Sequence, residues 1–583
     1  MAMQFSSFAA LVAAVMVMPV FGADSLTTLA EQSGFRITGR YDEVDALCHA
    51  FEKRYRGRAK CFSFGTTPEG RPLWAIAASD DGVVTAQQAR AKRRLVILAQ
   101  GGIHSGEIDG KDAGFLVLRE FLDAPRGPTS PLANATLLFV PVFSPDGHER
   151  FGKWNRPNQN GPEEMGWRAT AQNYNLNRDY TKADAPEMQA MLRLLNEWDP
   201  FVYVDLHVTD GAQFEHDISI TSEPREGGDR EVAILTDKIR DELIGRLEKQ
   251  GSLPLSWYPS FKIDDVPTSG ANVTPSLPRF STGYWGLSNR VALLVETHSW
   301  KDYPTRVRIT ANILRDLFDM AKTGAPGWLI TAQRADERAA RLAGTNYPLA
   351  FDVTDEARWI DFRGYAYERK PSEVSGALMT RYDATKPAIW RIPLYETVRV
   401  TRSTTVPTNG YLIPPAVATW LVPKLENHGI TVRPAKELPK SAQVWRASEF
   451  SVRPGTFEGH ATLNLKGEWK DEPVTLPRGT MFVPISQPKS RLVVALLEPD
   501  APDSYATWGF FATSFERKEY MEAYVAEEVA REMLKDPAIL KEFDEKLKND
   551  PKFAASPAAR LEFFYRKHSS WDEGYAKYPI VRY

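Results

Sequence analysis

The sequence Gly101-Gly102-Ile103-His104-Ser105-Gly106-Glu107 comes one residue after a short apolar run at 95–99. That run is partly β-branched and soon followed by glycine, which is typical of a buried strand. Two consecutive glycines allow the backbone to turn sharply after the strand. We therefore expect His104 and Glu107 to lie at a strand end and to face outward from it.

His104 and Glu107 have the spacing of a metal-binding pair. An imidazole and a carboxylate three residues apart can bind one cation, and a second histidine from elsewhere would complete the protein ligands of a catalytic zinc ion. Simpler interpretations exist, since Glu107 could stabilise the start of the following helix and His104 could be a hydrogen-bonded core residue. The pair becomes informative only together with other motifs.

The composition is that of a globular protein with more than one domain. The chain has 583 residues, of which 43% are hydrophobic and 25% charged, and this length exceeds what one ordinary core supports. The formal net charge of −3 argues against a nucleic-acid partner, which would require a basic excess.

An apolar run at 8–22 is followed by small residues and resembles a secretory signal. We predict a signal peptide at 1–23 and export to the periplasm or the medium, with no membrane span after its removal. The alternative is an uncleaved membrane anchor, because no Lys or Arg precedes the run.

The chain has two cysteines, Cys48 and Cys61. They lie in a predicted helix and at a predicted strand start, so that a disulfide is feasible in an oxidising compartment, and two buried thiols are the alternative. Two cysteines cannot form a cysteine-rich zinc site, and any metal must therefore be held mainly by His and carboxylate side chains.

Strands and helices alternate over residues 24–344. The predicted strands lie at 60–64, 73–77, 93–99, 135–142, 201–206 and 290–297, and the predicted helices at 41–55, 111–123, 187–198, 231–250, 305–321 and 328–342. This alternation indicates an α/β fold whose sheet is covered on both faces. Such sheets bind ligands at the carboxyl ends of their strands.

The pattern changes after Gly344, where short alternating stretches with frequent Pro and Gly predict a mostly β region. Further strands are expected at 442–450 and 459–465, and helices at 414–429, at 521–535 and from Pro537 onward. We thus predict a catalytic domain at 24–344 and a C-terminal domain at 345–583 that is β-rich and then helical. The residues of the C-terminal domain suggest no catalytic constellation.

Five sequence pieces of the first domain occur in an informative order: His104-Ser105-Gly106-Glu107, Trp167-Arg168, Asn175-Leu176-Asn177-Arg178, Asp205-Leu206-His207 and Val295-Glu296. In this order and spacing the chain resembles the carboxypeptidase A-like family of zinc metallocarboxypeptidases, over about residues 35 to 325. The resemblance implies a mixed, mostly parallel sheet flanked by helices, and an enzyme that hydrolyses C-terminal peptide bonds.

The resemblance also implies the metal site and the catalytic groups. His104, Glu107 and His207 would hold one Zn²⁺ per chain and leave a position open for water. Glu296 would be the general base, because it can take a proton from that water and pass it to the leaving amine. Arg168 would stabilise the developing oxyanion.

The substrate-binding residues implied by the resemblance are Asn177, Arg178 and Tyr284. Arg178 would bind the terminal carboxylate of a peptide through two hydrogen bonds, with Asn177 beside it. Tyr284 would close over the substrate, although it lies only twelve residues before Glu296. Tyr258 and Trp285 are alternatives to Tyr284, and all three could serve packing alone.

The sequence leaves three functions in competition. The leading interpretation is an exported zinc carboxypeptidase acting on peptides with a free carboxylate. A zinc amidase or deacylase acting on cell-wall peptides or N-acyl amino acids would use the same residues. A binding protein with a decayed site is the third, although no expected ligand or general base is missing.

Overall fold

The computed structural model of the protein describes residues 26–583. The predicted signal peptide at 1–23 lies outside the described residues. In the part of the chain that is described, none of the helices combines the length and the apolar character needed to cross a membrane.

The N-terminal half is built on one eight-stranded sheet with the order β1-β2-β4-β3-β5-β9-β6-β7. Its strands are β1 (Ala59–Thr66), β2 (Pro72–Ala78), β3 (Leu95–Gln100), β4 (Ala135–Val140), β5 (Val202–Val208), β6 (Ile218–Glu223), β7 (Pro254–Leu255) and β9 (Val291–Thr297). Four pairings are parallel (β3 with β4 and β5, β5 with β9, β6 with β7) and three are antiparallel. The prediction of a mixed, mostly parallel sheet is therefore confirmed, although the sequence did not predict β6 and β7.

Each face of the sheet has its own apolar core. Leu95, Ile97 and Ala99 of β3 lie in the first core, whereas Val96 and Leu98 lie in the second, as the two-residue period of a strand requires. The first core is covered by α2 (Tyr41–Arg54), α4 (Asp109–Asp123), α7 (Arg230–Lys249) and α9 (Tyr303–Ala339). The second is covered by α3 (Ala86–Ala91), α6 (Pro186–Trp198), α8 (Ser281–Gly286) and elements of the C-terminal half.

The two helices predicted at 305–321 and 328–342 form the single helix α9, which contains Pro326. A proline inside a helix leaves the carbonyl four residues earlier without its donor. Here that carbonyl belongs to Lys322 and accepts a hydrogen bond of 2.5 Å from Asn134 Nδ2. The prediction of two helices was wrong, since this contact and the burial of residues on both sides of Pro326 accompany one continuous helix, and neither can be seen in the local sequence.

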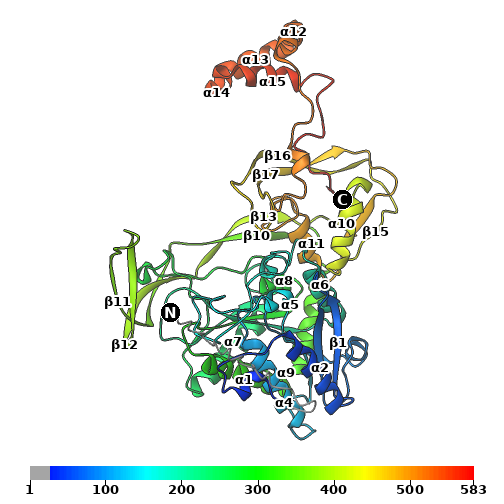
Figure 1. The fold of residues 1–583 in the computed structure, drawn as a ribbon. Coiled ribbons are helices and arrows are strands. Elements are labelled where there is room, and N and C mark those ends of the chain that lie inside the picture. Colours follow the sequence, from blue (N-terminus) through cyan, green and yellow to red (C-terminus); the bar gives the residue numbers. More distant parts are fainter. Residues whose placement is uncertain (1–25) are drawn as a thin grey trace, which may run out of the picture.

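The C-terminal half is β-rich, as predicted, and most of it packs on the second face of the sheet (Figure 1). Its strands are β10 (Asn346–Val353), β11 (Arg358–Pro371), β12 (Leu378–Tyr395), β13 (Val398–Thr405), β14 (Gly410–Ile413), β15 (Arg433–Pro434), β16 (Ser441–Val452), β17 (Leu463–Pro473), β18 (Met481–Pro484) and β19 (Val581–Arg582), with helices α10 (Pro415–Asn427) and α11 (Ser490–Leu497). The strand predicted at 459–465 is in fact β17, which starts later and is longer. The predicted domain boundary at residue 344 stays a prediction, because the second core contains residues from both sides of it.

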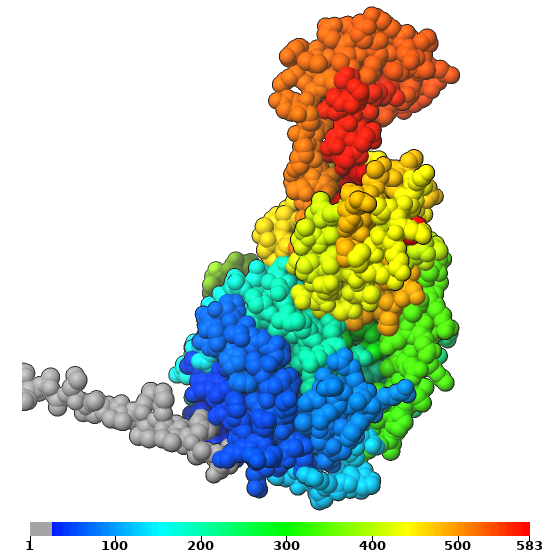
Figure 2. Space-filling model, turned by 90° about the vertical axis from the view of Figure 1, so that its right-hand side faces the viewer, coloured from blue at the N-terminus to red at the C-terminus, as the bar shows by residue number. Residues whose placement is uncertain are grey.

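Four helices near the C-terminus stand apart from the rest of the molecule. They are α12 (Ala523–Met533), α13 (Pro537–Asn549), α14 (Pro551–Ala555) and α15 (Pro557–Tyr565). Figure 2 shows them in orange and red, joined to the body by a narrow stalk. Phe553, Phe563 and Phe564 belong to a small core of their own.

A disulfide joins Cys48 of α2 to Cys61 of β1, with 5.3 Å between the two Cα atoms. Of the two alternatives left open by the sequence, the structure thus has the disulfide rather than the two thiols. The bond ties α2 to the edge strand of the eight-stranded sheet.

A buried ion cluster at the start of α4 gives a test of the fold. Lys111 Nζ lies 2.6 Å from Glu43 Oε2 and 3.2 Å from Asp112 Oδ1, and all three side chains are fully buried. Lys111→Met would leave two buried carboxylates without a cation, and we expect it to lower the free energy of unfolding by about 3–5 kcal/mol. In urea denaturation the control Lys92→Met, which removes an exposed pair with Asp81, should cost about 0–1 kcal/mol. A cost for Lys111→Met no larger than the control's would contradict this account.

Candidate active site

Two glycines direct the chain at the carboxyl end of β3. Gly102 has a φ of +60°, and a Cβ atom at Gly101 would lie 2.7 Å from the carbonyl oxygen of Pro141. Both positions therefore favour glycine. The turn that they permit places His104 and Glu107 at the edge of the sheet where β3 and β5 end.

His104, Glu107 and His207 meet at this edge, with one ligand atom from each lying within 4.8 Å of the others. The Nδ1 atom of His104 is 2.9 Å from Glu107 Oε1, and that of His207 is 2.9 Å from Glu107 Oε2. All three side chains are buried. Two imidazole nitrogens around one carboxylate form the donor set that zinc prefers in catalytic sites, so the predicted ligands fit a zinc ion.

The charges around the three residues favour an ionised Glu107. Although burial raises the pKa of Glu107, the Arg156 guanidinium and the two histidines hold that pKa well below its usual range. Burial lowers the pKa of His104 to about 4, so this imidazole is neutral, as a ligand must be. Burial also acts to lower the pKa of His207, but Asp205 and Glu107 outweigh it and raise the pKa well above its usual value.

Arg156 was not identified from the sequence. Its Nη1 atom lies 2.6 Å from Glu107 Oε1, and its Nη2 atom donates to the carbonyl oxygens of Val208 and Thr209. The side chain is buried, and both of its terminal nitrogens are hydrogen-bonded to the protein. It fixes the carboxylate of Glu107, and no local pattern in the sequence marked it.

Two further residues contact the Nε2 atoms of the histidines, which face away from Glu107. Asn175 Oδ1 lies 3.1 Å from His104 Nε2, and Asp205 Oδ2 lies 3.0 Å from His207 Nε2. Such partners fix the orientation and the tautomer of ligating imidazoles. Both residues belong to the sequence pieces that carried the family resemblance, yet the pieces alone gave them no role.

Glu296 lies beside His207, because β5 and β9 pair in parallel with these two residues in register. Its carboxyl group is buried, and Oε2 has no hydrogen-bond partner among the described residues. Burial, with a smaller contribution from the charge of Glu107, raises the pKa of Glu296 to about 8. A carboxyl group with this pKa can both take up and release a proton near neutral pH.

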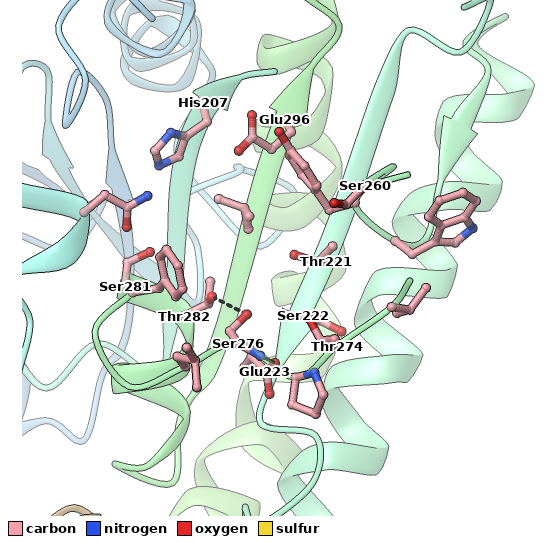
Figure 3. A pocket seen from close by; sticks show the side chains of 18 of the residues that line it. His207, Thr221, Ser222, Glu223, Ser260, Thr274, Ser276, Ser281, Thr282 and Glu296 are labelled. Carbon is pink, nitrogen blue, oxygen red and sulfur yellow. Dashed lines mark hydrogen bonds between the residues drawn. The ribbon is translucent and has the colours of Figure 1, made fainter. Parts of the chain in front are cut away.

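These residues open onto a cavity of about 670 Å³. In Figure 3, His207 and Glu296 lie at one end of the cavity, Thr221 lies further along, and Glu223 lies near Ser276 at the other end. β6 forms one wall, because Ser219 is in register with Glu296 and Thr221 with Leu294. The cavity therefore runs along β6 and β9, away from the group of His104, Glu107 and His207.

Arg168, Asn177 and Arg178 line the same cavity. The guanidinium of Arg178 lies 4.5 Å above the ring of Phe280 and donates to the carbonyl oxygen of Asn177. Arg168 is 39% exposed at its side chain, and its one hydrogen bond, to Glu107, is long at 3.4 Å. Unlike Arg156, Arg168 is therefore free to turn toward a bound molecule.

Tyr284 does not lie at this cavity, and its predicted contact with the substrate is corrected here. It is buried in α8 on the second face of the sheet, where its hydroxyl lies 2.9 Å from His428 Nδ1. The closeness of Tyr284 to Glu296 in sequence was misleading, because α8 points toward the C-terminal half. Its alternative Tyr258 lines the cavity, and burial together with the charge of Glu296 raises the pKa of Tyr258 well above its usual value.

The C-terminal half approaches the site through the turn between β16 and β17. The Asn175 amide donates to Glu458 Oε2 at 3.4 Å, and His460 Nε2 lies 2.7 Å from Asp184 Oδ2. Phe457 of the same turn stacks on Trp508 at 5.8 Å. Residues of both halves thus surround the segment that carries Asn177 and Arg178.

Comparisons with known proteins agree with this geometry. Residues 44–233 match the zinc carboxypeptidase family. Carboxypeptidase 2 of Trichophyton rubrum is 22% identical over 470 residues, which cover 76% of this chain and 78% of the relative, and carboxypeptidase 2 of Trichophyton equinum is 23% identical over 76% and 79%. The predicted resemblance of the N-terminal half to zinc metallocarboxypeptidases is confirmed.

Solved structures of metallocarboxypeptidases also align with part of the chain. The carboxypeptidase A from Helicoverpa armigera aligns with a TM-score of 0.35 and 14% identity, over 51% of this chain and 74% of that one. The metallo-carboxypeptidase from Burkholderia cenocepacia aligns with a TM-score of 0.34 and 14% identity, over 46% and 67%.

The contact between Asp205 and His207 predicts a specific effect on metal affinity. Asp205→Asn keeps the size of the side chain but removes the charge that orients the imidazole, so we expect zinc to bind about 10–100-fold more weakly. Competition with a chelator measures this affinity. Asp81→Asn, at a surface carboxylate, is the control and should leave it unchanged. Equal affinities in the two variants would show that Asp205 does not support the ligand.

Proposed function

We propose that this chain, whose residues 44–233 match the zinc carboxypeptidase family, removes single residues from the C-terminal ends of peptides. The observation that carries the proposal is the meeting of two histidine Nδ1 atoms on the Glu107 carboxylate, beside the buried Glu296 and at one end of a cavity that also holds Arg178. The proposed ligands of the zinc ion are His104, Glu107 and His207. Bound there, the ion would act as a Lewis acid toward the scissile carbonyl group and lower the pKa of a water molecule.

Glu296 is the proposed general base. Its unpartnered Oε2 takes the proton from the attacking water and then passes it to the amine of the departing residue. Arg168, which lines the same cavity, stabilises the negative charge that develops on the carbonyl oxygen.

Arg178 and Asn177 are the proposed site for the terminal carboxylate. A guanidinium forms two parallel hydrogen bonds with a carboxylate, and the ring of Phe280 beneath Arg178 restricts the plane in which it does so. Tyr258, at the wall of the same cavity, is the proposed tyrosine that covers the substrate. With the terminal carboxylate bound by Arg178, the proposed site of cleavage is the bond before the last residue, which is exopeptidase activity.

Export is also part of the proposal. The disulfide between Cys48 and Cys61 suits an oxidising compartment outside the cytosol. It supports the predicted signal peptide at 1–23, from whose removal the mature chain would start.

Glu296→Gln is the direct test of the chemistry. The amide cannot accept the proton, so we expect the rate of peptide cleavage to fall by about 10²–10⁴-fold while zinc content stays near one ion per chain. Mass spectrometry of peptides with free and with amidated C-termini measures the activity, and the wild type should shorten only the free ones. Zinc in both proteins with no peptide shortened by either would contradict the proposal, and would favour a cell-wall or N-acyl amide substrate.

The far end of the cavity suggests which terminal residue is preferred. Glu223 is buried there, about 13 Å along β6 from the level of Glu296 at ~3.3 Å per residue. Its carboxylate accepts hydrogen bonds of 2.7 Å from the amides of Ser276 and Arg225. No side chain among residues 26–583 forms an ion pair with it within 4.0 Å. We propose that the cationic side chain of a C-terminal Lys or Arg is the missing partner.

The preference should depend on pH through Glu223. Burial raises the pKa of Glu223 to about 7, so the carboxyl is neutral below this pH and charged above it. The ratio of kcat/KM for peptides ending in Lys and in Gln should therefore increase from pH 6 to pH 8. Taking the ratio removes the effect of Glu296, which acts on both peptides alike.

Glu223→Gln should remove both the preference for Lys and its dependence on pH. Glu226→Gln, at an exposed carboxylate three residues away, is the matched control and should keep both. A Lys/Gln ratio that is the same in all three proteins would contradict the assignment of Glu223.

A further inference from the structure

A long antiparallel ribbon of the C-terminal half leans against the catalytic half. It consists of β11 and β12, which pair from Arg358 opposite Leu394 to Pro371 opposite Leu378, and it projects to one side of the molecule in Figure 1. Its base is buried, since Phe362 is 1% exposed, whereas Val374 at its tip is 90% exposed. Only the base of the ribbon can therefore act on the rest of the protein.

At the base of the ribbon, β12 pairs with a segment of the catalytic half that forms part of the cavity wall. β12 pairs in parallel with β8 (Ala271–Asn272), and the amide of Val273 donates to the carbonyl oxygen of Tyr395 at 2.8 Å. β8 lies in the segment 256–277, and this segment supplies Tyr258, Ser260 and Thr274 to the cavity. The ribbon thus gives an otherwise irregular segment a regular strand partner.

Aromatic side chains join the same two parts. Phe362 stacks on Trp390 at 5.5 Å between ring centroids, and Phe362 lies 5.9 Å from the ring of Trp257, the residue before Tyr258. Phe261, from the same segment, lies 6.1 Å from Trp390. Gly364 makes this packing possible, because a Cβ atom there would lie 2.1 Å from the Trp390 ring.

We propose that the base of the β11–β12 ribbon is part of the substrate-binding machinery, with Phe362 and Trp390 as positioning residues for Tyr258. The proposal rests on the proposed function, since it assumes that Tyr258 covers a bound peptide. The segment has no helix longer than the 3₁₀ turn Pro267–Ser269 and only one strand, the two-residue β8 that pairs with β12, so its position depends on the ribbon. Loss of the ring at 362 would allow Tyr258 to move, and a shift of about 1 Å can cost up to about 100-fold in activity.

The test compares two substitutions on opposite faces of one strand. Phe362→Leu removes the buried ring but keeps an apolar side chain, and Trp359→Leu is the control, because Trp359 is 58% exposed on the other face. With a peptide substrate we expect Phe362→Leu to raise KM about tenfold, with kcat within about twofold and zinc content unchanged. Trp359→Leu should change none of the three. Trp390→Phe, a milder change in the same stack, should raise KM by less, and it replaces Phe362→Leu if that variant does not fold.

A double-mutant cycle separates positioning from a general loss of stability. If Phe362 acts through Tyr258, Phe362→Leu should have little further effect on KM in a Tyr258→Phe background, so that the two changes are not additive. Two outcomes would overturn this inference but leave the proposed function intact. They are additive effects of the two substitutions on KM, and an unchanged KM for Phe362→Leu in an enzyme that cuts peptides. A wild type that cuts no peptide would overturn the proposed function and the inference with it.

Discussion

The buried carboxylate of Glu107 is the group on which the rest of the site depends. A charge that is 3% exposed is stable only with compensating partners, and here they are two imidazoles and the Arg156 guanidinium. β3 and β5 must end at the same edge of the sheet to supply them. The next strand, β9, then brings Glu296 to the same place through its register with His207. The strand order and register of the sheet therefore determine which side chains meet at the site.

The parts of this arrangement that could be predicted are those with a local signal. Strands β3, β4, β5 and β9 are largely apolar and two glycines follow β3, so the α/β half could be predicted from local patterns. The grouping of His207 with His104 and Glu107 was implied by the resemblance to zinc metallocarboxypeptidases. No sequence motif marked Arg156, because it fixes the carboxylate of Glu107 through a contact that only the folded chain forms. Tyr284 was assigned to the site because it lies close to Glu296 in the sequence. In the structure it packs against His428 and does not reach the cavity.

Predictions also failed wherever a distant contact changed the local preference. Pro326 would end an isolated helix, whereas in α9 Asn134 donates to the carbonyl oxygen of Lys322 and the residues on both sides of the proline are buried in the first core. The irregular segment 256–277 carries no periodicity, and its course is set by pairing with β12. Neither partner could be located from a single sequence, since the contacting residues lie more than a hundred positions apart.

The C-terminal half is more closely involved in the site than its sequence suggested. Its core is continuous with the second face of the sheet, the β11–β12 ribbon supports the wall that carries Tyr258, and Glu458 contacts the backbone of Asn175. The helices α12–α15 stand clear of the body. Residues of both halves therefore surround the cavity, beyond the residues 44–233 that match the zinc carboxypeptidase family.

The measurement that tests the central claim most directly is anomalous X-ray diffraction at the zinc edge from crystals of the zinc-loaded protein. The account predicts one strong peak within about 2.0–2.2 Å of the Nδ1 atoms of His104 and His207 and of a carboxylate oxygen of Glu107. No peak at this position, or a peak held by other residues, would contradict it.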